Sequence, residues 1–151
     1  MKKFKFALQP VLDHRKRTED EKQLVVATRK RALDQAEAEL ARLNEEFRLH
    51  AQRLRDEHGK LDTSELQAIY AHLQFIDRCT VAQHKVVVER RLALDRARAE
   101  LLAASKEKKV VEKLKERRKE SFELEEQRVE QKELDDGNAR RYGRAMLGGT
   151  P

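Results

Sequence analysis

Five histidines and one cysteine are the side chains of this 151-residue sequence that are best suited to bind a metal ion. A zinc site needs three or four converging ligands, and two histidines on one helix converge when they are three or four residues apart. No pair of histidines has that spacing, and Cys79 is a lone cysteine best read as small apolar filler. We therefore expect no metal ion and no cofactor. The histidines are His14, His50, His58, His72 and His84.

Carboxylates are abundant, but they act as acid and base only where a cleft separates their pKa values. Clefts require layers joined by turns, and turn residues are scarce: from Val11 to Asp136 the only glycine is Gly59, and no proline occurs. Charged residues make up 41% of the chain and aromatic residues only 5%. This composition excludes sandwiches, barrels and α/β folds. We expect no enzyme and no small-molecule substrate.

The elements that carry these residues follow from a heptad pattern. Apolar residues recur every seven positions from Val26 to Leu61, and a second train runs from Leu66 to Leu101 with one polar member, Thr80. A sustained seven-residue repeat is typical of coiled coils, in which two helices wind about each other left-handedly. The pattern predicts an all-α protein with two long helices in one coiled coil.

A short break separates the two trains. Gly59 is suited to end a helix in the left-handed conformation, and Ser64 with Gln67 fits a capping box, with Asp62 and Thr63 as rival caps. So short a turn predicts an antiparallel hairpin over residues 1–136. We expect helix one at about 10–58, the turn at about 59–63, and a longer helix two at about 64–136.

Helix two is predicted to extend beyond helix one. With the turn centred near 61, Pro10 lies opposite residues 115–118, so some twenty residues of helix two lack a hairpin partner. Two apolar residues of this overhang, Phe122 and Val129, are left to pair with the N-terminal residues, with a partner or with a second copy. Residues 137–151 are predicted to form a flexible basic tail.

Charge along the overhang occurs in blocks. Between 106 and 120, eight basic residues stand against four acidic ones, and between 121 and 136 seven acidic residues stand against two basic ones. The net charge of the whole chain is +6, which permits an acidic partner. A basic helix that reads DNA would not carry regularly spaced glutamates, so we expect no nucleic-acid partner. A lone cysteine and short apolar runs favour a reducing cytoplasm.

The first residues carry a family resemblance. The stretch Phe4-Lys5-Phe6-Ala7-Leu8-Gln9-Pro10-Val11-Leu12-Asp13-His14-Arg15-Lys16-Arg17 resembles the opening of the FliJ family, coiled-coil stalks of the bacterial flagellar type III export apparatus. An aromatic and aliphatic cluster followed by Val-Leu and a basic residue opens helix one in that family. The size, the single turn and the longer second helix are similar as well.

The resemblance implies a non-enzymatic adaptor that binds and stimulates the hexameric flagellar export ATPase as a central stalk. It also implies contacts with export chaperones and with the export-gate membrane protein, and a cytoplasmic location at the periphery of the inner-membrane export apparatus. For the ATPase-facing end we expect a basic set: Arg15, Lys16, Arg17, Lys113, Arg117, Arg118 and Lys119.

Near the turn, the resemblance places contacts to chaperones or to the export gate on six residues: Leu43, Phe47, Tyr70, Leu73, Phe75 and His84. Periodicity alone puts Leu43, Phe47 and Leu73 on the seam, where packing explains them, whereas Tyr70 and Phe75 lie off it. Exposed aromatics on a charged rod often mark a contact surface. The alternatives that stay open are the stalk of a virulence type III secretion ATPase and a generic coiled-coil scaffold.

Overall fold

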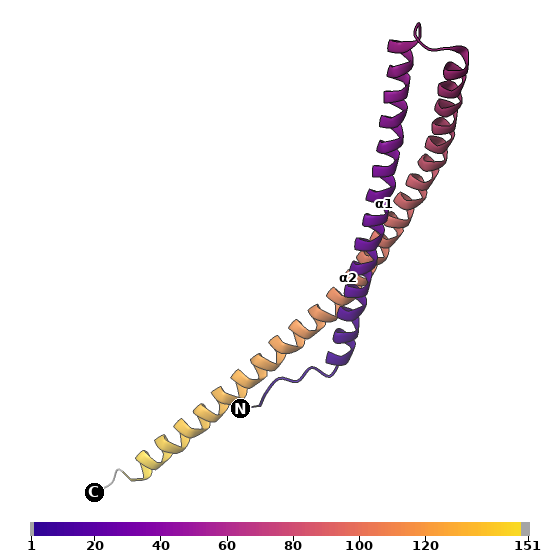
Figure 1. Cartoon of the computed structure of the whole chain (residues 1–151). Coiled ribbons are helices and arrows are strands. Elements are labelled where there is room, and N and C mark those ends of the chain that lie inside the picture. Colours follow the sequence, from indigo (N-terminus) through magenta and orange to yellow (C-terminus); the bar gives the residue numbers. More distant parts are fainter. Residues whose placement is uncertain (1, 149–151) are drawn as a thin grey trace. The chain divides into compact units, whose positions relative to one another are not determined.

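The protein is described by a computed structural model over residues 2–148, and it consists of two helices (Figure 1). Helix α1 runs over Gln9–Glu57 and helix α2 over Thr63–Leu147. The described residues form no strand. The predicted all-α class and the longer second helix are confirmed. None of the described helices carries an apolar stretch long enough to cross a lipid bilayer.

The chain divides into two compact units. The first, which we call the hairpin unit, is Arg17–Ser105 and contains most of α1 and the first half of α2. The second, which we call the terminal unit, combines Met1–Lys16 with Lys106–Pro151.

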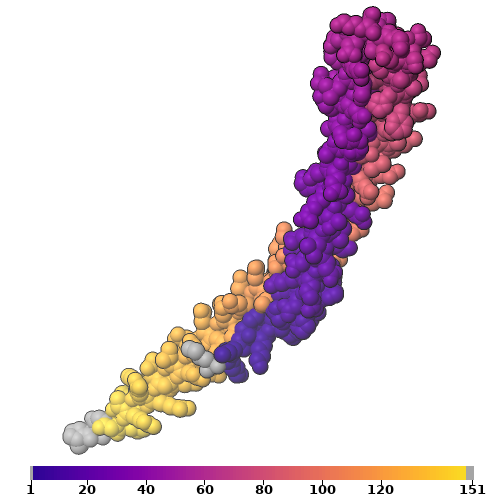
Figure 2. Space-filling model, in the orientation of Figure 1, coloured from indigo at the N-terminus to yellow at the C-terminus, as the bar shows by residue number. Residues whose placement is uncertain are grey.

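In the hairpin unit α1 and α2 lie side by side and antiparallel (Figures 1 and 2). Contacts between the helices show this direction, because residues later in α1 contact residues earlier in α2. Lys22 pairs with Glu100, and Gln83 donates to the backbone carbonyl of Ala36. The predicted antiparallel hairpin is therefore observed.

The core of the hairpin unit is the predicted seam. Apolar side chains at heptad positions of both helices are buried because each helix presents one stripe to the other. A central cluster is formed by Leu33, Ala36, Val87 and Leu94, with Val26, Leu40 and Val86 packed against it. Phe47 is the seam residue that departs from this pattern, since its side chain is 40% exposed. In a pair of helices, each helix covers only one side of the other. A large ring at the edge of the seam is therefore only partly buried.

Two polar seam positions are accommodated by backbone carbonyls. The Thr80 hydroxyl donates to the carbonyl of Ile76 at 2.8 Å, one turn earlier in the same helix. The Gln83 amide donates across the seam to the carbonyl of Ala36 at 2.9 Å. Neither side chain is left as an unsatisfied polar group in an apolar contact, which would cost about 1–3 kcal/mol.

The turn between the helices differs in detail from the sequence prediction. Among residues 2–148 no glycine has a positive φ, so the left-handed Gly59 was a wrong prediction. Instead the Lys60 amide donates to the Glu57 carbonyl at 2.9 Å, which closes the last turn of α1 without a left-handed residue.

The cap of α2 is Asp62, one of the two rivals to Ser64. The Glu65 amide donates to the Asp62 carboxylate at 2.7 Å, and the Asp62 amide donates to the Glu65 carboxylate at 3.2 Å. This reciprocal pair is a capping box. Ser64 has a comparable partner in Gln67, but the carboxylate of Asp62 also suits the positive end of the helix dipole.

Helix α2 ends later than expected, at Leu147 rather than near 136. A glycine inside a helix costs about 1 kcal/mol relative to alanine and does not by itself break it. Gly137 and Gly143 are accommodated in this way, and the good helix formers Ala139, Arg140 and Arg141 lie between them. The flexibility of residues 137–151 stays a prediction, and residues 149–151 lie outside the described residues.

The terminal unit is built by the N-terminal residues packing along α2. Phe6 and Leu12 are buried, and the Phe4 and Phe122 rings lie 5.7 Å apart between centroids. Lys115 donates to the Gln9 side chain at 2.8 Å, which agrees with the predicted alignment of the start of helix one with residues 115–118. Of the partners left open for the overhang, the N-terminal segment covers Phe122, whereas Val129 remains 54% exposed.

The seam makes a first testable prediction from two leucines two residues apart on α2. Leu94 is 3% exposed and Leu92 is 51% exposed. Leu94→Ala should lower the free energy of unfolding by about 2–5 kcal/mol, because it removes buried methyl groups and leaves a cavity. Leu92→Ala should change it by less than about 0.5 kcal/mol. Urea unfolding followed by circular dichroism measures both, and equal losses would contradict the seam.

Candidate functional site

The predicted ATPase-facing residues are distributed over both units. The terminal unit holds Arg15, Lys16, Lys113, Arg117, Arg118 and Lys119, and Arg17 belongs to the hairpin unit. All seven side chains except that of half-buried Arg15 are classed as exposed. The side chains therefore remain accessible to a partner.

The structure does not bring the six residues of the terminal unit to one point. Arg15 pairs with Glu107 at 2.5 Å, whereas Arg118 lies over the ring of Phe6, 5.8 Å from its centroid. Lys113 is six residues beyond Glu107 on α2, or roughly 9 Å along the helix at 1.5 Å per residue. The basic stretch 113–119 instead lies beside the segment that precedes and opens α1. The basic side chains of this unit thus occupy two places, one beside Glu107 and one beside Phe6 and Gln9.

The N-terminal segment gives the basic stretch its local structure. Phe6 is 8% exposed, and its ring receives the Arg118 guanidinium on its face, as a cation–π contact does. Lys115 turns inward to Gln9, so the neighbouring cations Lys113, Arg117 and Lys119 remain on the outside of α2. The sequence signal for this docking is the aromatic pair Phe4 and Phe6, which belongs to the N-terminal residues named above as one possible partner of the overhang.

The six residues predicted near the turn do not form one surface either. Leu43 and Leu73 are buried at 7% and 9% exposure, so packing explains them, as periodicity indicated. Tyr70 and Phe75 are 51% and 55% exposed, which agrees with their positions off the seam. They are five residues apart, however, so their side chains leave α2 about 140° apart. His84 is exposed and nine residues from Phe75, on the opposite side of the helix.

A groove along the hairpin unit collects part of this set. It has a volume of about 490 Å³ and runs between α1 and α2 over the seam residues Leu43 and Ile76. Phe75 and the half-buried Cys79 line it as well, whereas Phe47, Tyr70, Leu73 and His84 do not. The remaining lining residues are Glu39, Arg42, Glu46, Ala82, Gln83 and Val86.

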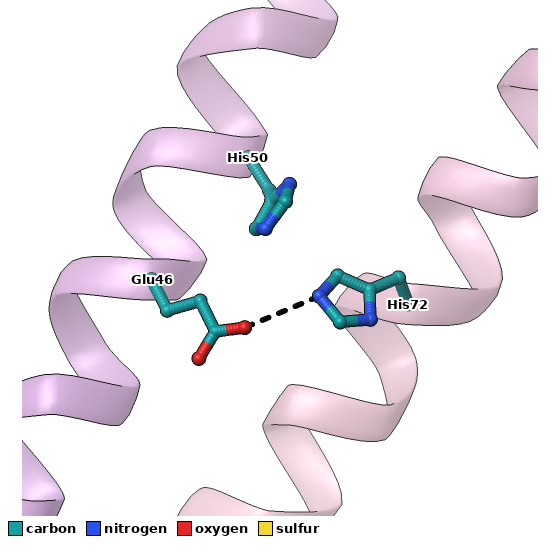
Figure 3. Close-up of side chains that lie close together, drawn as sticks. All are labelled: Glu46, His50 and His72. Atoms are coloured by element: carbon teal, nitrogen blue, oxygen red, sulfur yellow. Dashed lines mark ion pairs between the residues drawn. The ribbon is translucent and has the colours of Figure 1, made fainter.

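Sequence reasoning missed a cluster at one end of this groove, where Glu46 and His50 of α1 meet His72 of α2 (Figure 3). Each residue offers one donor atom within 4.8 Å of the other two. The Glu46 carboxylate lies 3.3 Å from His72 Nε2, and the two imidazole rings meet edge to face at 4.6 Å.

The spacing rule for one helix could not reveal this cluster, because the two histidines belong to different helices. A usable signal was present: His50 and His72 are each eleven residues from Leu61, the expected centre of the turn. In an antiparallel hairpin, residues equally far from the turn lie opposite each other.

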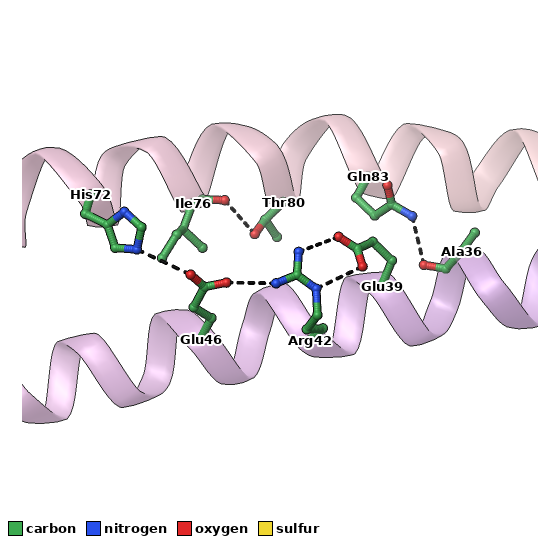
Figure 4. Close-up of polar contacts among 8 residues, drawn as sticks. All are labelled: Ala36, Glu39, Arg42, Glu46, His72, Ile76, Thr80 and Gln83. Carbon is green, nitrogen blue, oxygen red and sulfur yellow. Dashed lines mark hydrogen bonds and ion pairs between the residues drawn. The ribbon is translucent and has the colours of Figure 1, made fainter.

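A chain of ion pairs leads away from the cluster along the groove (Figure 4). Arg42 donates to Glu46 at 3.1 Å and, through two nitrogens, to Glu39 at 2.6 and 2.9 Å. The bidentate hydrogen bonds hold the pKa of Glu39 below its ordinary value and raise the pKa of Arg42. Both side chains therefore stay charged, and Glu46 is held by a cation on one oxygen and by His72 on the other.

Comparison with known proteins agrees with the architecture. A sequence model described as "Flagellar FliJ protein" matches residues 4–147. Among solved structures, a proposed YscO homologue from Chlamydia trachomatis is similar, with a TM-score of 0.55 and 22% identity over 96% of this chain and 99% of that one. At this identity the likeness concerns the fold. No match was found among curated proteins.

The docking of the N-terminal segment yields the second prediction. Phe6→Ala should release residues 2–8 from α2, because the substitution removes a buried ring and its contact with Arg118. Trypsin cleavage after Lys5 should become several-fold faster under native conditions. Val11→Ala, a change at a 40% exposed side chain of the same unit, is the matched control and should leave the cleavage rate unchanged. Equal rates for the wild type and Phe6→Ala would show that the segment is not docked.

Proposed function

The chain belongs to the FliJ family of flagellar proteins, and from this premise we propose that it is a non-enzymatic adaptor of flagellar type III protein export. It acts as a central stalk that binds and stimulates the hexameric export ATPase, and it escorts export chaperones to the export-gate membrane protein. We place it in the cytoplasm, at the periphery of the inner-membrane export apparatus. The observation that carries the proposal is the family match over residues 4–147 together with the two-helix architecture.

The terminal unit supports the ATPase part of the proposal. A ring of subunits offers a narrow bore, and a helix with exposed charge on its outer side can present cations to acidic groups of that bore. Lys113, Arg117 and Lys119 are exposed on α2, and the N-terminal segment covers another part of the same helix. The side of α2 that the N-terminal segment leaves uncovered therefore carries these three cations.

The hairpin unit supports the chaperone part. Tyr70 and Phe75 are half-exposed aromatic side chains, and aromatic residues dominate the energetics of many protein interfaces. Phe75 lines the groove and Tyr70 lies on a different side of α2. We propose that these two rings serve separate contacts, one to a chaperone and one to the export gate.

The third prediction tests the ATPase contact. At a fixed ATPase concentration, the protein should stimulate ATP hydrolysis by the flagellar export ATPase of the same organism and shift it from monomer to ring. Substitution of Arg117 and Arg118 by Glu should reduce the stimulation at least about tenfold. The new carboxylates would repel the acidic groups of the ATPase that the two arginines attract. Added salt should weaken the wild-type effect.

A matched control is available in the same helix. Arg140 and Arg141 are likewise adjacent and exposed, and their reversal to Glu should leave the stimulation intact. Because Arg118 also contacts Phe6, Arg117→Glu alone separates loss of charge from undocking of the N-terminal segment. Absence of both stimulation and co-migration would overturn the stalk function and favour a scaffold. If the protein stimulated only a virulence type III secretion ATPase, it would be assigned to that secretion system instead.

The fourth prediction concerns the aromatic residues of the hairpin unit. Tyr70→Ala should weaken binding of one partner, and Phe75→Ala that of the other, each by about tenfold or more, which is the loss expected for a hot-spot ring. Helix content should stay constant because both side chains are at least half exposed. Pull-down and calorimetric titration with chaperones and with the cytoplasmic part of the gate measure the effect. If the variants lost helix content and kept their binding, the two rings would serve packing and not partner contacts.

A further inference from the structure

The cluster of Glu46, His50 and His72 is a set of metal ligands that no part of the stalk function uses. We propose that these three side chains bind one divalent transition-metal ion, with Zn²⁺ as the best match, and that the bound ion links α1 to α2 near the turn. The proposal does not rest on the function proposed above.

The three donor types fit this class of ion. Two imidazole nitrogens and one carboxylate oxygen are a known ligand set of zinc sites, in which water takes the fourth position. Mg²⁺ and Ca²⁺ prefer oxygen ligands alone, so the two imidazoles select against them. The chemistry of the cluster therefore favours a borderline-soft divalent ion.

The geometry is close to that of a formed site. Zinc lies 2.0–2.2 Å from nitrogen and oxygen ligands, which places tetrahedral donor atoms about 3.4 Å apart. The Glu46 carboxylate and His72 Nε2 are already 3.3 Å apart, and every pair of donors lies within 4.8 Å. On binding, the separations that exceed about 3.4 Å, none of which is larger than 4.8 Å, would be closed by rotation of the side chains.

The surroundings orient the ligands. Glu46 and His50 are four residues apart, so both side chains leave the same face of α1. His72 stacks on Phe75 with ring centroids 6.5 Å apart. Arg42 holds the other carboxylate oxygen of Glu46 and is itself neutralised by Glu39, so a hydrogen-bonded outer shell of the kind that supports metal ligands is present.

Binding would have a mechanical consequence for the hairpin. The ligands lie on both sides of the turn, and an ion that joins them closes the loop from residue 50 to residue 72. This cross-link stabilises the folded turn end of the hairpin, because the ion binds the folded pair and loses its ligand set when the helices separate.

The experiment is a titration of the full-length protein with ZnCl₂, with MgCl₂ as the comparison. We expect one Zn²⁺ per monomeric chain by calorimetry, a higher melting temperature in Zn²⁺ and no effect of Mg²⁺. Co²⁺ should give the intense visible absorption of a four-coordinate site. His50→Ala, His72→Ala and Glu46→Gln should each weaken binding at least about tenfold, since even outer-shell changes cost 10–100-fold.

His58→Ala is the matched control, because His58 is an exposed histidine just beyond the end of α1 and outside the cluster. It should bind Zn²⁺ like the wild type. Imidazole resonances of the wild-type protein give a second test that needs no variant: Zn²⁺ should shift those of His50 and His72 and leave the other three unchanged. Weak binding equal to that of Mg²⁺, unchanged affinity in both histidine variants, or one ion shared by two chains would overturn the proposal.

Discussion

The burial of one apolar stripe of α1 against one apolar stripe of α2 is the interaction on which the other features of the hairpin unit depend. A pair of helices has no third layer, so the side chains between them are the core. Ile76 is 1% exposed and Leu94 is 3% exposed, and among the described residues no polar or charged side chain is buried. A one-residue slip of one helix along the other would move the seam side chains out of the holes that they fill in the partner helix. The seam therefore fixes the register as well as the stability.

The register in turn decides which polar side chains meet. Lys22 faces Glu100, Arg91 faces Glu37, and His72 faces Glu46. Such exposed pairs contribute only about 0.2–1 kcal/mol each, so they do not hold the helices together. They favour the observed antiparallel alignment over slipped ones, in which these pairs would be lost. Gln83 adds a stricter condition, because its amide reaches the Ala36 carbonyl only in this register.

Sequence reasoning predicted the features that periodicity encodes and missed those that depend on local competition or on the register. The two helices, the turn and the seam residues Leu33 and Leu94 follow from the heptad repeat. The choice between Asp62 and Ser64 as the cap depends on local competition, because each has a box partner three residues later and only the Asp62–Glu65 pair forms.

Helix α2 extends past Gly137 to Leu147 because a lone glycine, although it favours a helix end, costs only about 1 kcal/mol inside a helix. The pairing of His50 with His72 required two helices to be aligned, which no single-helix spacing can show. Likewise, the contact of Phe6 with Arg118 depends on how the N-terminal residues fold back along α2.

In the hairpin unit, polar side chains that have fixed neighbours lie at the edge of the seam. The groove over Leu43 and Ile76 lies between the two helices, and charged side chains such as Glu39, Arg42 and Glu46 line it as well. Polar side chains at the edge of the seam are half-buried, and neighbours on both helices hold them in place. His72 is such a residue: the register gives it Glu46 and His50, and α2 gives it Phe75. The same constraint that makes the core thin thus leaves ordered polar groups accessible at its edge, where an ion or a partner protein can reach them.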